Sequence, residues 1–365
     1  MLNGVKRALR KVIVCRRKHK LFSSIMKGSK ALVKSHPEWV ALTRAEKALM
    51  TDKDYCQYVA FKNIRGVLEY GHVSDALYQA YILPVLNPAN YTELFRSTRK
   101  SNIFCNKNYF ELMLKYFPMP KAVIRCINGV LMNADYRILT EEEALKEMNH
   151  HESLVFKPAT GGYHGRNISC VERKDFRDAL TKYVNYDNGG DLIVQIILRQ
   201  HESFSRFNSS SVNVIRITTL FWKKELYVLG GILRVGAPGE FCDLTTSPDN
   251  NHPRIIALDD KGSLTGKFID PDLVYVHDDC YGVKPSGFIP KYEQMKELAL
   301  KEHSRFPYQG IIGWDITLDE NENIICIEYN TGTPGIIQSQ YALGPIFAQK
   351  SSRGRPLIDE ILSEV

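Results

Sequence analysis

The 365-residue sequence predicts an α+β fold with an N-terminal helical region. In the first hundred residues, apolar side chains recur at mixed spacings of three and four, as they do along one side of a helix. From Ser153 onward, short runs rich in β-branched and aromatic residues replace this pattern. Tight polar turns such as Lys223-Lys224 join these runs, and hairpin connections favour an antiparallel over a parallel sheet.

The apolar spacing and the positions of prolines set the expected helices. We expect helices at residues 5–14, 21–33, 44–86 and 106–116, with two more near 174–185 and 291–305. Prolines at 84 and 88 end the third of them, and Pro118 and Pro120 impose extended backbone after the fourth. We expect strands at residues 153–157, 167–171, 191–197, 212–221, 225–235, 254–258, 310–318 and 324–329.

Charge is distributed unevenly along the chain. Residues 1–36 contain eleven Lys or Arg and no Asp or Glu, which leaves 37 of the 48 basic residues against all 41 acidic ones elsewhere. We interpret 1–36 as a basic amphipathic arm and 37–100 as a separate helical region. The arm suits a helix lying on an anionic membrane surface or, equally, a solvated helix docked on the rest of the protein. No aromatic platform or known motif accompanies the charges, so we expect no nucleic-acid partner.

Composition also bounds the location of the protein. No apolar stretch approaches the roughly 18 residues that cross a bilayer, and no secretory signal is recognisable. We therefore expect a cytoplasmic protein, with peripheral contact at the inner face of the membrane if the arm binds lipid. The eight cysteines form no CxxC pair or zinc-type spacing, so we expect reduced thiols.

Two strands near the C-terminus carry a candidate metal site. The runs 311–318 and 324–329 flank the acidic turn 319–323, and a symmetric hairpin places Asp315 opposite Glu328. Asn330, two residues beyond Glu328, projects to the same side. Two carboxylates and an amide oxygen are ligands that Mg²⁺ accepts, whereas a solvent-facing cross-strand pair of acids is the alternative.

A second candidate is a lysine that leaves a strand into a glycine-rich loop. Lys157 is followed by Gly161, Gly162 and Gly165, and such glycines let backbone amides approach a phosphate. The segment is not a Walker A loop, because no Lys-Ser/Thr follows the last glycine. Further on, the strand at 191–197 leads to Glu202, an arrangement that can present main-chain groups to adenine and a carboxylate to ribose.

Taken in order, these residues resemble the ATP-grasp superfamily: Lys107 before a helix, Lys157 before a glycine-rich flap, a hinge strand, Glu202, then Asp315 and Glu328-x-Asn330. The segments 211–217, 231–236, 313–315 and 327–330 are similar, more narrowly, to the sugar-transfer-associated ATP-grasp proteins, which are related to α-L-glutamate ligases. The resemblance covers about residues 100–350.

This resemblance implies two α+β lobes that hold a nucleotide between largely antiparallel sheets. The catalytic domain would span 101–350, with the central lobe and flap at about 101–197, the C-terminal lobe at about 198–350 and a C-terminal tail at 351–365. The implied cofactors are ATP and Mg²⁺, in two ions bound by Asp315, Glu328 and Asn330. The implied nucleotide contacts are Lys107, Lys157, Gly161, Gly162, Gly165, Gln195, Ile197, Leu198, Glu202 and Asn213.

The activity implied is that of a ligase which phosphorylates a carboxylate and lets an amine displace the phosphate. Its partners would be a small-molecule or glycan acceptor carboxylate and an amine such as an amino acid, in surface-polysaccharide biosynthesis. Lys157, Arg216 and Arg234 would serve the chemical step. Phosphate transfer to a hydroxyl and a nucleotide-binding scaffold without turnover are the alternatives.

Two departures from the superfamily pattern bear on the site. Many of its ligases carry an arginine two residues before the metal aspartate, where this chain has Gly313, so we expect Arg216 or Arg234 to supply that charge. The narrower family commonly shows Asp-Asn and then a Gly-Gly pair after the Arg-Val-Gly segment. At this place, residues 242–251 of the present chain have a different sequence, which predicts an altered acceptor pocket.

Overall fold

The computed structural model describes residues 2–88, 103–160, 167–184, 191–332 and 334–365. Its helices are α1 (Leu2–Ser35), α2 (Arg44–Lys47), α3 (Tyr55–Arg65), α4 (Asp75–Leu77), the π-helix η1 (Tyr78–Ile82), α5 (Leu83–Leu86), the 3-10 helix η4 (Lys107–Tyr109), α7 (Phe110–Met113), α8 (Glu141–Met148), the 3-10 helix η5 (Arg173–Asp175), α9 (Phe176–Val184), α10 (Glu202–Ser205), α11 (Tyr292–His303), α12 (Ile337–Leu343) and α13 (Leu357–Leu362). Its strands are β1 (Ala122–Ile127), β2 (Val130–Asn133), β3 (Ser153–Pro158), β4 (Ser169–Glu172), β5 (Leu192–Gln195), β6 (Val214–Trp222), β7 (Glu225–Val235), β8 (Arg254–Leu258), β9 (Leu264–Ile269), β10 (Val276–His277), β11 (Ile311–Leu318) and β12 (Ile324–Asn330).

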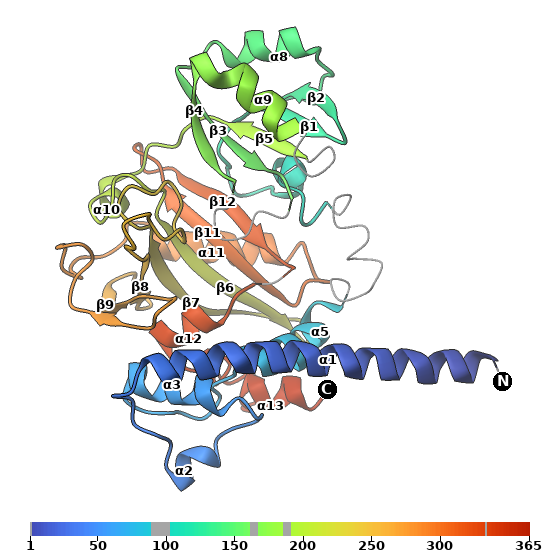
Figure 1. Cartoon of the computed structure of the whole chain (residues 1–365), viewed down its shortest axis with the longest axis vertical. Helices are drawn as coiled ribbons and strands as arrows, with labels where there is room; N and C mark the ends of the chain where they lie inside the picture. The colour runs from blue at the N-terminus through green and yellow to red at the C-terminus, as the bar shows by residue number, and fades with distance from the viewer. Residues whose placement is uncertain (1, 89–102, 161–166, 185–190, 333) are drawn as a thin grey trace.

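The strands form two sheets, and every strand pairing in them is antiparallel. The smaller sheet has the order β2-β1-β5-β3-β4, and the larger has the order β10-β9-β8-β7-β6-β11-β12. Figure 1 shows the smaller sheet with α8 and α9 at one end of the molecule and the larger sheet below it. The predicted α+β class with largely antiparallel sheets is confirmed.

Each lobe has its own apolar core. In the smaller lobe, Ile124, Phe156 and Val194 on the sheet pack with Leu145 of α8 and Leu180 of α9. Burial of such side chains contributes about 1.5–3 kcal/mol each relative to exposure. The larger sheet packs one face on α11 through a core that contains Trp314, Met295 and Ala299, and its other face on the N-terminal and C-terminal helices.

The eight strands expected from the sequence are all present, with ends displaced by a few residues at most. Four others were not expected, namely β1, β2, β9 and β10. Polar or glycine residues interrupt the apolar pattern in two of them: Arg125 lies within β1, and Gly266 and Lys267 lie within β9. Their pairing is set by neighbouring strands and not by their own composition.

Helices differ more from expectation. The two helices expected within 1–36 are one continuous helix, α1. The helix expected at 106–116 is shorter, because the amides of Lys115 and Tyr116 donate to the carboxylate of Glu302 on α11 and so leave the helical pattern. The segment expected as a C-terminal tail contains α13, whose Leu357 and Ile361 are fully buried. Among the described residues, no helix has both the length and the apolarity to cross a membrane.

Candidate functional site

The site lies on the face of the larger sheet that turns away from α11. Successive residues of a strand point to opposite faces. Ile215 and Ile217 on β6, and Trp314 on β11, enter the core under α11. Arg216 lies between the two isoleucines in sequence, and Asp315 follows Trp314, so both side chains reach the other face. Arg234 of β7 reaches that face too.

The expected pairing of the two candidate metal acids is confirmed. Asp315 on β11 lies directly opposite Glu328 on β12, and Gly313 lies opposite Asn330. The Asn330 side-chain nitrogen is 3.3 Å from Oδ2 of Asp315. The three side chains thus share one face, although the register of the hairpin shifts by one residue between Asp315 and Ile316, so an irregularity in the pairing brings Asp315 opposite Glu328.

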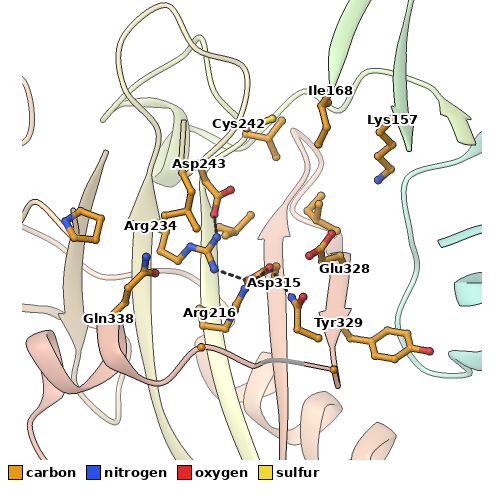
Figure 2. Close-up of a pocket in the computed structure, with 18 of the residues that line it drawn as sticks. Lys157, Ile168, Arg216, Arg234, Cys242, Asp243, Asp315, Glu328, Tyr329 and Gln338 are labelled. Carbon is orange, nitrogen blue, oxygen red and sulfur yellow. Dashed lines mark hydrogen bonds and ion pairs between the residues drawn. The ribbon is translucent and has the colours of Figure 1, made fainter. Parts of the chain in front are cut away.

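Asp315 is held by two arginines from neighbouring strands (Figure 2). Nε and Nη2 of Arg216, directly across from it on β6, donate to Oδ1 and Oδ2 at 2.5 and 2.7 Å. Nη1 of Arg234 donates to Oδ1 at 3.2 Å. Burial opposes ionisation of Asp315, yet the two guanidinium groups hold its pKa below the usual value.

A fourth charged residue, Asp243, was not selected from the sequence. It forms an ion pair with Nη2 of Arg234, so that two carboxylates and two guanidinium groups alternate on this face. Burial raises the pKa of Asp243 to about 6, against the opposing charge of Arg234. The only sequence signal was that Asp243 falls in the segment 242–251, where the chain departs from the family pattern.

Gly313 explains how Arg216 reaches Asp315. A Cβ atom built on Gly313 would lie 3.2 Å from both Cδ and Nη1 of Arg216. That separation is too short for ordinary packing, so the glycine provides the space in which the arginine lies. The space at the position where the resemblance to ATP-grasp ligases implies an arginine is therefore filled by the Arg216 side chain of the adjacent strand.

Two lysines approach the same face from the smaller lobe. Nζ of Lys107 is 3.2 Å from Oε2 of Glu328. Lys157, at the end of β3, is 6% exposed. Burial and the nearby charge of Lys107 lower the pKa of Lys157 to about 8. The amide of Lys107 donates to the carbonyl of Ala159 at 2.8 Å, which joins the two lysine-bearing segments.

A cavity of about 730 Å³ connects these groups. Its lining includes both lysines, both arginines, Asp243, Asp315, Glu328 and Asn330, as well as Gln195 and Leu198 from the expected hinge. It also includes residues of the N-terminal helices that the sequence did not connect with the site: Ile25, Gly28, Ser29, Leu32, Gln57 and Asp75. The cavity therefore runs from the two lobes to helix α1.

Some expected nucleotide contacts are not brought to this cavity. Within the described part of the chain, Ile197, Glu202 and Asn213 do not line it, and Glu202 is exposed at the start of α10. The Asn213 amide is used inside the fold, since Nδ2 donates to the carbonyls of Phe204 and Asn208. We therefore correct its assignment to a structural role. Gly161, Gly162 and Gly165 lie outside the described residues.

The side-chain oxygens of Asp315, Glu328 and Asn330 are of the kind that Mg²⁺ prefers as ligands. The two carboxylates differ in how many hydrogen bonds they already accept. Both oxygens of Asp315 already accept two donors each, from Arg216 together with Arg234 or Asn330. Glu328 accepts only from Lys107 among the described residues, and its side chain is 25% exposed. A carboxylate oxygen offers about two acceptor directions. Glu328 is consequently the more available metal ligand of the two acids.

Comparison with protein families matches residues 87–352 to the sugar-transfer associated ATP-grasp family. The chain belongs to this family. A search of curated proteins finds no match. Among solved structures, this ATP-grasp protein is similar to the VanG D-Ala:D-Ser ligase of Enterococcus faecalis, at 14% identity over 72% of this chain and 62% of that one, with a TM-score of 0.45.

It is also similar to D-alanyl-alanine synthetase A of Vibrio cholerae O1, at 13% identity over 73% of this chain and 65% of that one, with a TM-score of 0.44. A third similar structure is the biotin carboxylase of Campylobacter jejuni, at 14% identity over 75% of this chain and 55% of that one, with a TM-score of 0.42. The ATP-grasp protein spans less than two thirds of the length of each of these structures.

Proposed function

We propose that this ATP-grasp protein is an ATP-dependent ligase that joins a carboxylate to an amine through an acyl phosphate. The observation that carries the proposal is the single cavity in which two lysines, two candidate metal acids and two buried arginines converge. We further propose that it attaches an amino acid to a glycan or glycan precursor in surface-polysaccharide biosynthesis, on the cytoplasmic side of the membrane. The family's description as sugar-transfer associated supports a glycan acceptor.

The lysines would hold the nucleotide. Lys157 and Lys107 project into the cavity from the smaller lobe, where their charges would neutralise phosphate oxygens of ATP. Phosphate would also favour the charged form of Lys157, whose pKa is lowered in the free protein. Glu328, Asp315 and Asn330 would hold Mg²⁺, which supplies charge stabilisation to the transferring phosphoryl group.

The arginine pair would hold the reacting acid. Arg216 and Arg234 are nearly fully buried, and planar guanidinium groups bind carboxylate or phosphate oxygens in fixed orientations. A carboxylate oxygen of the acceptor would attack the γ-phosphorus as ADP leaves. The amine nitrogen would then attack the acyl carbon, with loss of a proton and departure of phosphate. The arginines would stabilise the charge that develops in both steps.

Hydroxylamine trapping tests the proposal. The full chain is incubated with Mg²⁺, ATP, a panel of uronic and amino acids, and hydroxylamine, which converts an acyl phosphate into a stable hydroxamate. We expect hydroxamate and ADP in equal amounts with the correct acid, and neither product from Glu328→Gln. A phosphorylated hydroxyl without hydroxamate would indicate a phosphotransferase instead, and ATP binding without turnover on any substrate would indicate a scaffold.

A further inference from the structure

Helix α1 forms part of the cavity wall along one of its sides. Ile25, Gly28 and Leu32 line the cavity. Ser29, on the same side, is buried, and its hydroxyl is 3.2 Å from Oδ2 of Asp54. This contact and the apolar packing of Leu32 fix how α1 is rotated about its axis.

The opposite side of α1 is a row of cations. Lys27, Lys30 and Lys34 each follow a cavity-lining residue by two positions, which is about 200° around a helix. Arg16 and Lys20 extend the row, because the eighteen residue steps from Arg16 to Lys34 make about five turns and span about 27 Å. We call these five exposed residues the cationic row.

In the part of the chain that the structure describes, no carboxylate is paired with the cationic row. None of its five members forms an ion pair with a described residue, and the first 36 residues contain no acid. Some exposed cations of the lobes are paired: Arg177, for example, contacts both Glu141 and Glu142. Aligned cations repel one another, and an extended anionic surface relieves that repulsion.

We propose that α1 lies on an anionic lipid bilayer with the cationic row facing the head groups. In the sequence, Val5, Leu9 and Val12 continue the spacing of the row toward the N-terminus. Figure 1 shows this end of α1 extending beyond the lobes.

This orientation separates the cavity from the bilayer by one helix, or about 10–12 Å. A substrate that remains attached to lipid could then place its polar end in the cavity. The membrane contact does not depend on the catalytic assignment, but the lipid-attached substrate rests on the proposed function. The two parts are therefore tested by separate measurements.

Vesicle sedimentation with the full chain tests the contact. The vesicles are phosphatidylcholine alone or an equimolar mixture with phosphatidylglycerol, each at low and high salt. The row variant changes Lys20, Lys27, Lys30 and Lys34 to Gln. A control changes four exposed lysines of the two lobes, Lys146, Lys182, Lys224 and Lys261, to Gln, so that both variants lose the same net charge.

We expect binding to the anionic vesicles alone, with weakening at high salt. Each cation removed from the row should lower the partition coefficient about fivefold, so the row variant should bind at least a hundredfold more weakly than the control. Equal losses in both variants, binding to neutral vesicles, or no binding by the full chain would overturn the proposal. So would row-dependent binding to duplex RNA or DNA that exceeds binding to vesicles at the same salt.

Discussion

Replacing Lys157 with Met separates the binding role of this lysine from its cost to the fold. The side chain is 6% exposed, and burial and Lys107 lower its pKa from 10.5 to about 8 even though Glu328 acts in the opposite direction. Each pKa unit corresponds to 1.36 kcal/mol, so holding this charge in the folded protein costs about 3 kcal/mol. Met preserves most of the side-chain volume without the charge.

The sign of the effect follows from the two pKa values. Below about pH 8, Lys157 is protonated in both states and the full cost is present. Between about 8 and 10.5, the unfolded chain binds the proton and the folded chain does not, so this group makes stability rise with pH. Above 10.5 the cost is gone. We therefore expect Lys157→Met to raise the free energy of unfolding at pH 7 by up to about 3 kcal/mol.

The assay is urea unfolding of the wild type, Lys157→Met and the exposed-site control Lys146→Met, at pH 7 and pH 9. Isothermal titration with ATP and Mg²⁺ measures binding on the same samples. We expect the Met variant to be more stable at pH 7, to lose part of that advantage at pH 9, and to bind ATP at least tenfold more weakly. Equal or lower stability at pH 7 would refute the burial cost. Unchanged ATP affinity would refute the phosphate contact.

Three further predictions concern the charged sheet face. Asp315→Asn leaves Arg216 and Arg234 without their shared carboxylate and should destabilise the protein by about 3–5 kcal/mol in urea unfolding; wild-type stability would contradict this. Glu328→Gln should abolish ATP turnover while stability stays within about 1 kcal/mol, because the side chain is partly exposed and does not join the arginines. Gly313→Ala should displace Arg216 and lower kcat at least tenfold with little change in ATP affinity, whereas an unchanged kcat would show that Arg216 is not required in its present position.

Local patterns in the sequence determined most of the backbone. Short runs rich in β-branched and aromatic residues, separated by tight turns, located eight strands, since such side chains pack well on a sheet and each turn has characteristic residues. A symmetric hairpin about the acidic turn also placed Asp315 opposite Glu328, and the structure reaches this pairing through a one-residue register shift between Asp315 and Ile316. The two unexpected pairs of strands carry polar or glycine residues and depend on neighbours distant in sequence.

The arrangement of the charged groups was decided by tertiary structure. Arg216 and Asp315 are 99 residues apart, and Arg234 and Asp315 are 81 apart. Whether they meet depends on the order β7-β6-β11 and on the register of each pairing, which packing of the whole sheet determines. The ion pair of Asp243 with Arg234 has the same origin. The position of α1 against the cavity was also decided by tertiary structure. The sequence gives the charge and the residue spacing of a helix, but not the surface on which the helix packs.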